Sequence, residues 1–188
     1  MTRIVGIAGS LRKGSYNGLL LRAAVALMPE GAELEPASLH GIPLYDGDLE
    51  AASGTPDPVR ALQERIAASD GLFLVTPEYN NSIPGVFKNA VDWLSRPSKE
   101  SARVFEGKPV ALAGATPGRG GTMLAQAAWL PVLRALGIRP WFGPRLFVSE
   151  AGKLFDADGR LTDATVRTQL QGFVTGFVQF VRNPAGGE

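Results

Sequence analysis

Short apolar runs alternate with helical patterns along almost the whole chain, and this alternation restricts the possible folds more than any other feature. Five apolar runs bounded by turn residues predict buried strands, at residues 4–9, 32–39, 71–76, 110–115 and 139–148. Apolar side chains at helical spacing predict five helices, at residues 17–27, 59–66, 85–94, 122–136 and from about 163 onward. Strands and helices that alternate in this way predict an open parallel sheet with helices on both faces.

The segments between these elements carry strong turn residues. Residues 40–58 predict a long loop, and Gly143-Pro144 interrupts the last predicted strand. Pro131 lies inside a predicted helix and is expected to kink it. No internal repeat or interdomain linker is visible, so we expect one domain over residues 1–182 and a flexible tail over residues 183–188.

The composition is that of a globular protein whose partners are neither nucleic acids nor membranes. The chain has 188 residues, of which 45% are hydrophobic and 20% are charged, enough to bury a core. The formal net charge is +1 and the basic residues are scattered, so no attraction to nucleic acid or to an anionic membrane is indicated. No run approaches the roughly 20 apolar residues that cross a bilayer. We therefore expect a cytoplasmic protein.

The chain has no cysteine, and His40 is its only histidine. These two facts exclude thiolate metal sites, Fe–S clusters, a cysteine nucleophile and a metal site with paired histidines. His40 lies in a polar segment after a predicted strand, where we expect it to be solvated. We expect no metal site.

The loop after the first predicted strand has the residues of a phosphate cradle. It offers the hydroxyls of Ser10 and Ser15, the guanidinium of Arg12, the amide of Asn17 and the N-terminus of a helix. The loop lacks both the Gly-Lys-Ser/Thr ending of a Walker A sequence and the glycine spacing of a dinucleotide fingerprint, so a monophosphate suits it better than a triphosphate. The same residues are also compatible with an N-capping turn after a buried strand.

Two more loops follow strands. The loop of residues 76–85 is stiffened by two prolines and contains Tyr79, whose flat ring can line or stack on a planar ligand. A rigid surface turn with an exposed tyrosine explains that loop equally well. The glycines of the loop at residues 115–121 let bare backbone approach a ligand closely. Because ligands bind beyond the carboxyl ends of the strands in such sheets, we expect the three loops to form one site.

Three ordered motifs resemble the NADPH-dependent FMN reductase family, and within it the bacterial chromate and quinone reductases. The motifs lie at residues 10–17 (Ser-Leu-Arg-Lys-Gly-Ser-Tyr-Asn), 76–80 (Thr-Pro-Glu-Tyr-Asn) and 82–97, a run that begins Ser-Ile-Pro-Gly. Residues 42–46 and 107–110 also match, so the resemblance covers most of the chain in the correct order. The family usually has Gly-x-x-Gly-Gly in the third loop, whereas this chain has the shorter Gly-Arg-Gly-Gly.

The resemblance implies a flavodoxin-like fold, a three-layer α/β/α sandwich around a five-stranded parallel sheet in the order 2-1-3-4-5. It also implies bound FMN, NADPH or NADH as the hydride donor, and a homodimer or a dimer of dimers. The residues of the matching first loop are expected to bind the cofactor, with Leu11 and Tyr16 beside four residues on the phosphate, Ser10, Arg12, Ser15 and Asn17. The residues expected around the isoalloxazine ring are Pro77, Glu78, Tyr79, Asn80, Ala115, Thr116 and Gly118.

We therefore expect an FMN-dependent oxidoreductase that passes electrons from NAD(P)H to small acceptors such as quinones, flavins, ferric complexes, azo dyes or chromate. Because the flavin performs the redox chemistry, no catalytic side chain is expected. Two alternatives remain, a non-enzymatic flavodoxin-type electron carrier and an α/β module that binds another phosphate ligand. Carriers of the first kind usually have strongly acidic surfaces, and the net charge of +1 argues against that alternative.

Overall fold

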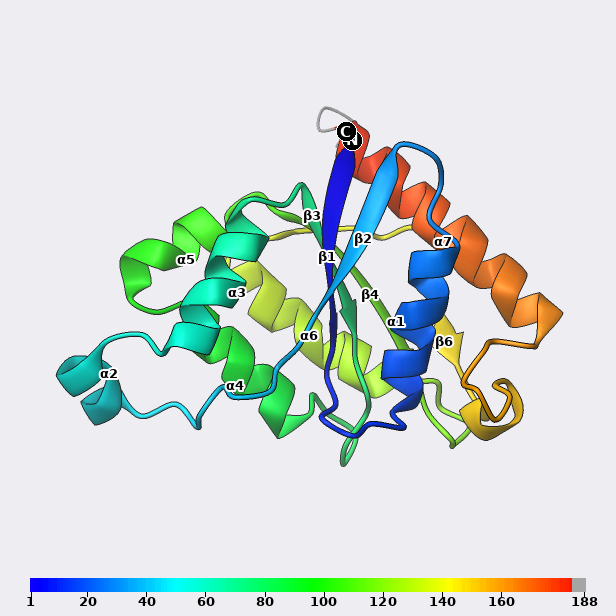
Figure 1. Cartoon of the computed structure of the whole chain (residues 1–188), viewed down its shortest axis with the longest axis horizontal. Coiled ribbons are helices and arrows are strands. Elements are labelled where there is room, and N and C mark those ends of the chain that lie inside the picture. Colours follow the sequence, from blue (N-terminus) through cyan, green and yellow to red (C-terminus); the bar gives the residue numbers. More distant parts are fainter. Residues whose placement is uncertain (184–188) are drawn as a thin grey trace.

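The computed structural model describes residues 1–183, whose strands form one parallel sheet with helices on both faces (Figure 1). The strand order is β2-β1-β3-β4-β5, and β6 also pairs with β4. The bounds of the strands are β1 Thr2–Ala8, β2 Ala32–Ala37, β3 Gly71–Val75, β4 Pro109–Ala115, β5 Arg139–Pro140 and β6 Phe147–Val148. This order confirms the flavodoxin-like topology. The last predicted strand consists of two short segments, because the chain leaves the sheet around Gly143-Pro144 as its turn residues predicted.

Seven α-helices and one short 3₁₀ helix are present in the described part of the chain. Their bounds are α1 Tyr16–Ala26, α2 Gly47–Ser53, α3 Asp57–Ala67, α4 Gly85–Leu94, α5 Ser98–Phe105, α6 Met123–Ala135, η1 Ala151–Lys153 and α7 Ala164–Arg182. The prediction of five helices was wrong in two places. The expected loop at residues 40–58 contains α2, which buries no residue and therefore shows no apolar stripe, and α5 buries only Val104 and Phe105.

Successive side chains of the central strands point to opposite faces of the sheet. On β3, Leu72 and Leu74 join an apolar core with α3, α4, α5 and α6, whereas Phe73 and Val75 join a second core with α1 and α7. A strand that is buried on both faces requires an unbroken apolar run, and such a run is visible in the sequence. The helix layers leave the carboxyl ends of β1, β3 and β4 open at the lower edge of the sheet in Figure 1.

Three large aromatic side chains are buried, whereas the single histidine is exposed. Trp93 is fully buried, and its indole N–H donates to the carbonyl oxygen of Pro43 at 2.9 Å. Phe173 and Phe177 pack in the core. His40 is exposed, as predicted. Residues 184–188 of the predicted tail lie outside the described residues. No helix within residues 1–183 is long and apolar enough to cross a membrane.

Candidate functional site

The loops after β1, β3 and β4 line one cleft at the carboxyl edge of the sheet, which we call the three-loop cleft. Its lining comprises Ser10, Arg12, Ser15, Tyr16, Asn17, Pro77, Glu78, Tyr79, Ala115, Thr116 and Pro117. The sequence therefore predicted every residue of the lining except Pro117, which lies in the third loop beside two predicted residues. Leu11, Asn80 and Gly118 were also predicted to bind the cofactor, but they lie outside this lining.

The first loop presents unneutralised positive charge to the cleft. Ser15 is the N-cap of α1, and its hydroxyl accepts a hydrogen bond from the Gly18 N–H at 3.4 Å. The N–H groups of Tyr16 and Asn17 belong to the first turn, where a helix provides no internal acceptor. Arg12 forms no ion pair with any residue from 1 to 183, and its guanidinium donates only to the carbonyl oxygen of Gly14, at 3.2 Å. The helix terminus and this cation together suit an anion.

Asn17 has a different position from the one expected of a phosphate ligand. Its side-chain nitrogen donates to the carbonyl oxygen of Ala115 at 2.8 Å, and its side-chain oxygen accepts from the Ala115 N–H at 2.9 Å. The residue is only 3% exposed, so α1 is joined to the end of β4 by a buried pair of hydrogen bonds. Any contact of Asn17 with an anion in the cleft would therefore come from its backbone N–H.

The second loop ends in a tight hairpin that holds Tyr79 at the mouth of the cleft. Tyr79 and Ser82 exchange two backbone hydrogen bonds, each with an N···O distance of 3.1 Å. The two residues between them have positive φ angles, 51° for Asn80 and 61° for Asn81, which is the geometry of a type I′ turn. Asparagine tolerates this conformation better than most residues, so the sequence Asn-Asn fits the turn. Tyr79 is left 48% exposed beside the cleft.

Contacts with later segments fix the second and third loops. The carboxylate of Glu78 accepts from the Ala125 N–H in the first turn of α6, at 3.0 Å. In the third loop, Thr116 donates its N–H to the carbonyl oxygen of Val148 and accepts from the Ala151 N–H, at 2.9 and 3.0 Å. Because Glu78 caps α6, it ties the second loop, and with it one wall of the cleft, to that helix.

Gly114, just before the third loop, allows an unusually close approach of three chain segments. A side chain at this position would overlap the hydroxyl of Thr122 and the carbonyl oxygen of Thr76. Thr122 itself is fully buried and has a positive φ of 64°. No local pattern predicts this contact, because it joins the ends of β3 and β4 to the start of α6. It fixes how far apart the second and third loops lie.

The cleft can thus hold an anionic group at the start of α1 and a flat group between the second and third loops. A family model described as NADPH-dependent FMN reductase matches residues 2–153. The chain belongs to the NADPH-dependent FMN reductase family. FMN, which the description of the family names, has the required shape, because it joins one phosphate to a planar ring system. FMN therefore fits the residues that are present.

Proteins similar over nearly their whole length include several members named as reductases. An NAD(P)H-dependent FMN reductase of Pseudomonas aeruginosa is 43% identical over 184 residues, which cover 98% of this chain and 97% of that protein. A quinone reductase of Escherichia coli K12 is 36% identical over 183 residues, with 96% and 95% covered. The structure of FerB, a flavoenzyme NAD(P)H:(acceptor) oxidoreductase of Paracoccus denitrificans, matches with a TM-score of 0.87 and 35% identity, covering 97% of this chain and 98% of FerB.

Proposed function

We propose that this protein is an FMN-dependent NAD(P)H oxidoreductase whose acceptors are quinones and other small oxidants. The observation that carries the proposal is the three-loop cleft. The Arg12 guanidinium, which has no ion-pair partner among residues 1–183, and the start of α1 lie at one end of a slot for a planar group. An electron carrier of the flavodoxin type would have the same cleft. Membership in a reductase family and the near-neutral charge of +1 favour the enzyme.

Each part of the cleft has a separate binding task in this proposal. The hydroxyls of Ser10 and Ser15, the guanidinium of Arg12 and the first N–H groups of α1 hold the phosphate. The segment of residues 77–80 and the backbone of Ala115 and Thr116 flank the ring system. Bound FMN would supply the redox chemistry, which is acceptance of a hydride from a nicotinamide and delivery of electrons to an acceptor. The side chains bind and orient the flavin, and none is assigned a proton-transfer role.

Quinones are the proposed acceptors, with free flavins, ferric complexes, azo dyes and chromate as further candidates. The support for quinones is the naming of relatives, including a 2-hydroxy-1,4-benzoquinone reductase of a Burkholderia species that is 38% identical over 181 residues. The exposed Tyr79 ring at the mouth of the cleft is suited to stack on a flat acceptor. Reliance on NAD(P)H, an intracellular reductant, supports the expected cytoplasmic location.

We also propose that the protein forms a homodimer, or a dimer of dimers. The exposed apolar residues Leu44 and Leu49, 81% and 37% exposed, support an interface at α2 and the segment just before it. Light scattering combined with gel filtration would measure the mass in solution. A mass of one chain at micromolar concentration would contradict the dimer.

The test of the proposed activity is anaerobic reduction of the reconstituted protein. We expect the purified chain to bind FMN with a flavin absorbance band near about 450 nm, and NADH or NADPH to bleach that band rapidly. Addition of benzoquinone should restore it. A flavin band that neither nicotinamide bleaches would favour the electron carrier. A chain that cannot be loaded with FMN would favour a module for another phosphate ligand.

A further inference from the structure

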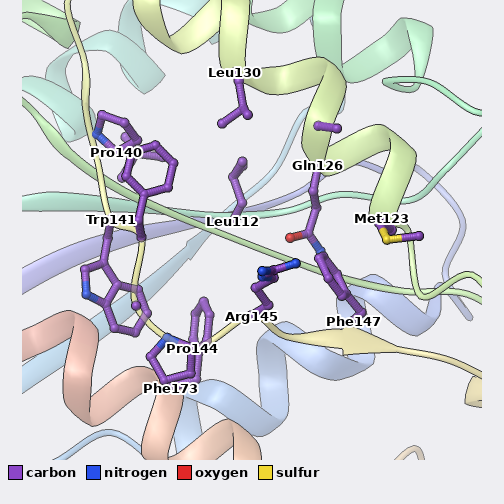
Figure 2. A pocket seen from close by; sticks show the side chains of 14 residues that line it. Leu112, Met123, Gln126, Leu130, Pro140, Trp141, Pro144, Arg145, Phe147 and Phe173 are labelled. Atoms are coloured by element: carbon purple, nitrogen blue, oxygen red, sulfur yellow. The ribbon is translucent and has the colours of Figure 1, made fainter.

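A second cavity, of about 450 Å³, opens at the β5 edge of the sheet (Figure 2). Its walls come from β4, from α6, from the chain between residues 140 and 147, and from Phe173 of α7. We call it the edge cavity. Among residues 1–183, it shares no lining residue with the three-loop cleft.

The cavity exists because the fifth strand is interrupted. The N–H of Trp141 still donates to the carbonyl oxygen of Val110 at 2.8 Å, and the N–H of Gly114 reaches the carbonyl oxygen of Leu146 at 3.4 Å. Between these two bonds the connecting chain bows away from β4. The Trp141 ring packs edge-on against Phe173, with ring centroids 4.8 Å apart, which leaves Leu112 of β4 uncovered at the floor. A gap of this size lies within the range of small-molecule sites, about 300–1,000 Å³.

Two polar side chains face this apolar space (Figure 2). The amide nitrogen of Gln126 donates to the Thr122 hydroxyl at 3.2 Å and to the carbonyl oxygen of Leu146 at 3.1 Å. These bonds hold a side chain that is only 9% exposed, and they turn its oxygen toward the cavity, where no donor from residues 1–183 meets it. Arg145 extends into the same space, is the only charged residue of the lining, and forms no ion pair within the described chain.

We propose that the edge cavity binds a small aromatic anion that also carries a hydroxyl or N–H donor. The flat, apolar walls, including Trp141 and Pro140, suit an aromatic ring. The Arg145 guanidinium provides the cation for a carboxylate or sulfonate, and the fixed Gln126 oxygen provides an acceptor for the donor group. The proposal is independent of the flavin cleft and of the activity proposed for it.

The test uses 8-anilinonaphthalene-1-sulfonate, which has an aromatic body, a sulfonate and one N–H, and which fluoresces on entering an apolar site. We expect the FMN-loaded full-length protein to bind one molecule per chain. Arg145→Gln should weaken binding about tenfold, the scale of one charge-assisted hydrogen bond. Ala127→Trp, which fills the cavity from the exposed face of α6, should abolish it. Arg134→Gln, an exposed arginine on the same helix outside the cavity, is the matched control and should bind as the wild type does.

Three results would overturn the proposal. The first is equal affinity of the wild type and Arg145→Gln, because the anion would then not be held by that guanidinium. The second is displacement of the probe by FMN in the apoprotein, which would place the probe in the three-loop cleft. The third is binding that appears only when a dimer is diluted into monomers, because a second copy of the chain would then be the occupant of the edge cavity. Flavin absorbance recorded in each sample shows separately whether the variants keep the folded cleft.

Discussion

The buried side chain of Asn17 provides the sharpest test of how the cleft is built. Replacing it with alanine removes both hydrogen bonds to Ala115 and leaves that residue's N–H and C=O without partners. Each such loss costs roughly 1–3 kcal/mol, and the higher helix propensity of alanine returns roughly 0.5 kcal/mol. We therefore expect Asn17→Ala to lower the free energy of unfolding by about 3 kcal/mol.

The assay for Asn17→Ala is urea unfolding of the apoprotein, so that bound flavin adds nothing to the measured stability. Gln171→Ala is the matched control, because it removes an amide from an exposed position on α7, and we expect a change within about 0.5 kcal/mol. The reasoning would be refuted if Asn17→Ala left the unfolding free energy unchanged but raised the FMN dissociation constant at least about tenfold. That result would make the Asn17 side chain a phosphate ligand after all.

Three further predictions concern the phosphate end of the cleft, the packing around Gly114 and the half-buried Lys108. Arg12→Ala should weaken FMN binding by about 1.5–3 kcal/mol in a fluorescence titration, whereas Arg22→Ala, on α1 outside the lining of the cleft, should not. Equal dissociation constants of the wild type and Arg12→Ala would count against the phosphate assignment. Gly114→Ala should lower the free energy of unfolding by about 1–3 kcal/mol, because the added methyl group overlaps Thr122 and the carbonyl oxygen of Thr76. The control is Gly85→Ala, which has open space around it and should be close to neutral when both variants are unfolded in urea. Burial lowers the pKa of Lys108 from its ordinary 10.5. At pH values between the lowered pKa and 10.5, the unfolded chain therefore binds more protons than the folded chain, and the free energy of unfolding rises with pH. Lys108→Met should remove this rise, which is at most about 1.4 kcal/mol per pH unit. An unchanged slope in urea titrations approaching pH 10.5 would contradict the lowered pKa of the half-buried Lys108.

The sheet and the place of the site followed from the sequence because both depend on short-range patterns. A strand buried on both faces, such as β3, must be apolar at every position, and the loops that follow parallel strands necessarily meet at one edge. The helices α2 and α5 escaped prediction because they bury two residues or fewer. An apolar periodicity reveals a helix only when one face of that helix is buried, and α2 and α5 bury too few residues to show one.

The finer structure of the cleft depends on contacts between residues far apart in the chain. Asn17 and Ala115 are 98 positions apart, and Glu78 and Ala125 are 47 apart. Nothing local distinguishes an asparagine that binds a strand end from one that binds a phosphate, because the same amide serves both. The edge cavity was hidden for a related reason, since Gly143-Pro144 predicted an interruption but not the space that the displaced chain leaves behind.

The two outer strands of the sheet also bear on how the protein behaves when it is concentrated. On one side, β2 carries the charged residues Glu33 and Glu35 and ends beside Pro36, which has no N–H to donate. On the other side, β5 has only two residues, of which the second is Pro140. Long, apolar, unpaired strand edges are the usual starting points of aggregation, and neither side of this sheet offers one. Copies of the chain should therefore associate through helices and loops and resist growth into fibrils.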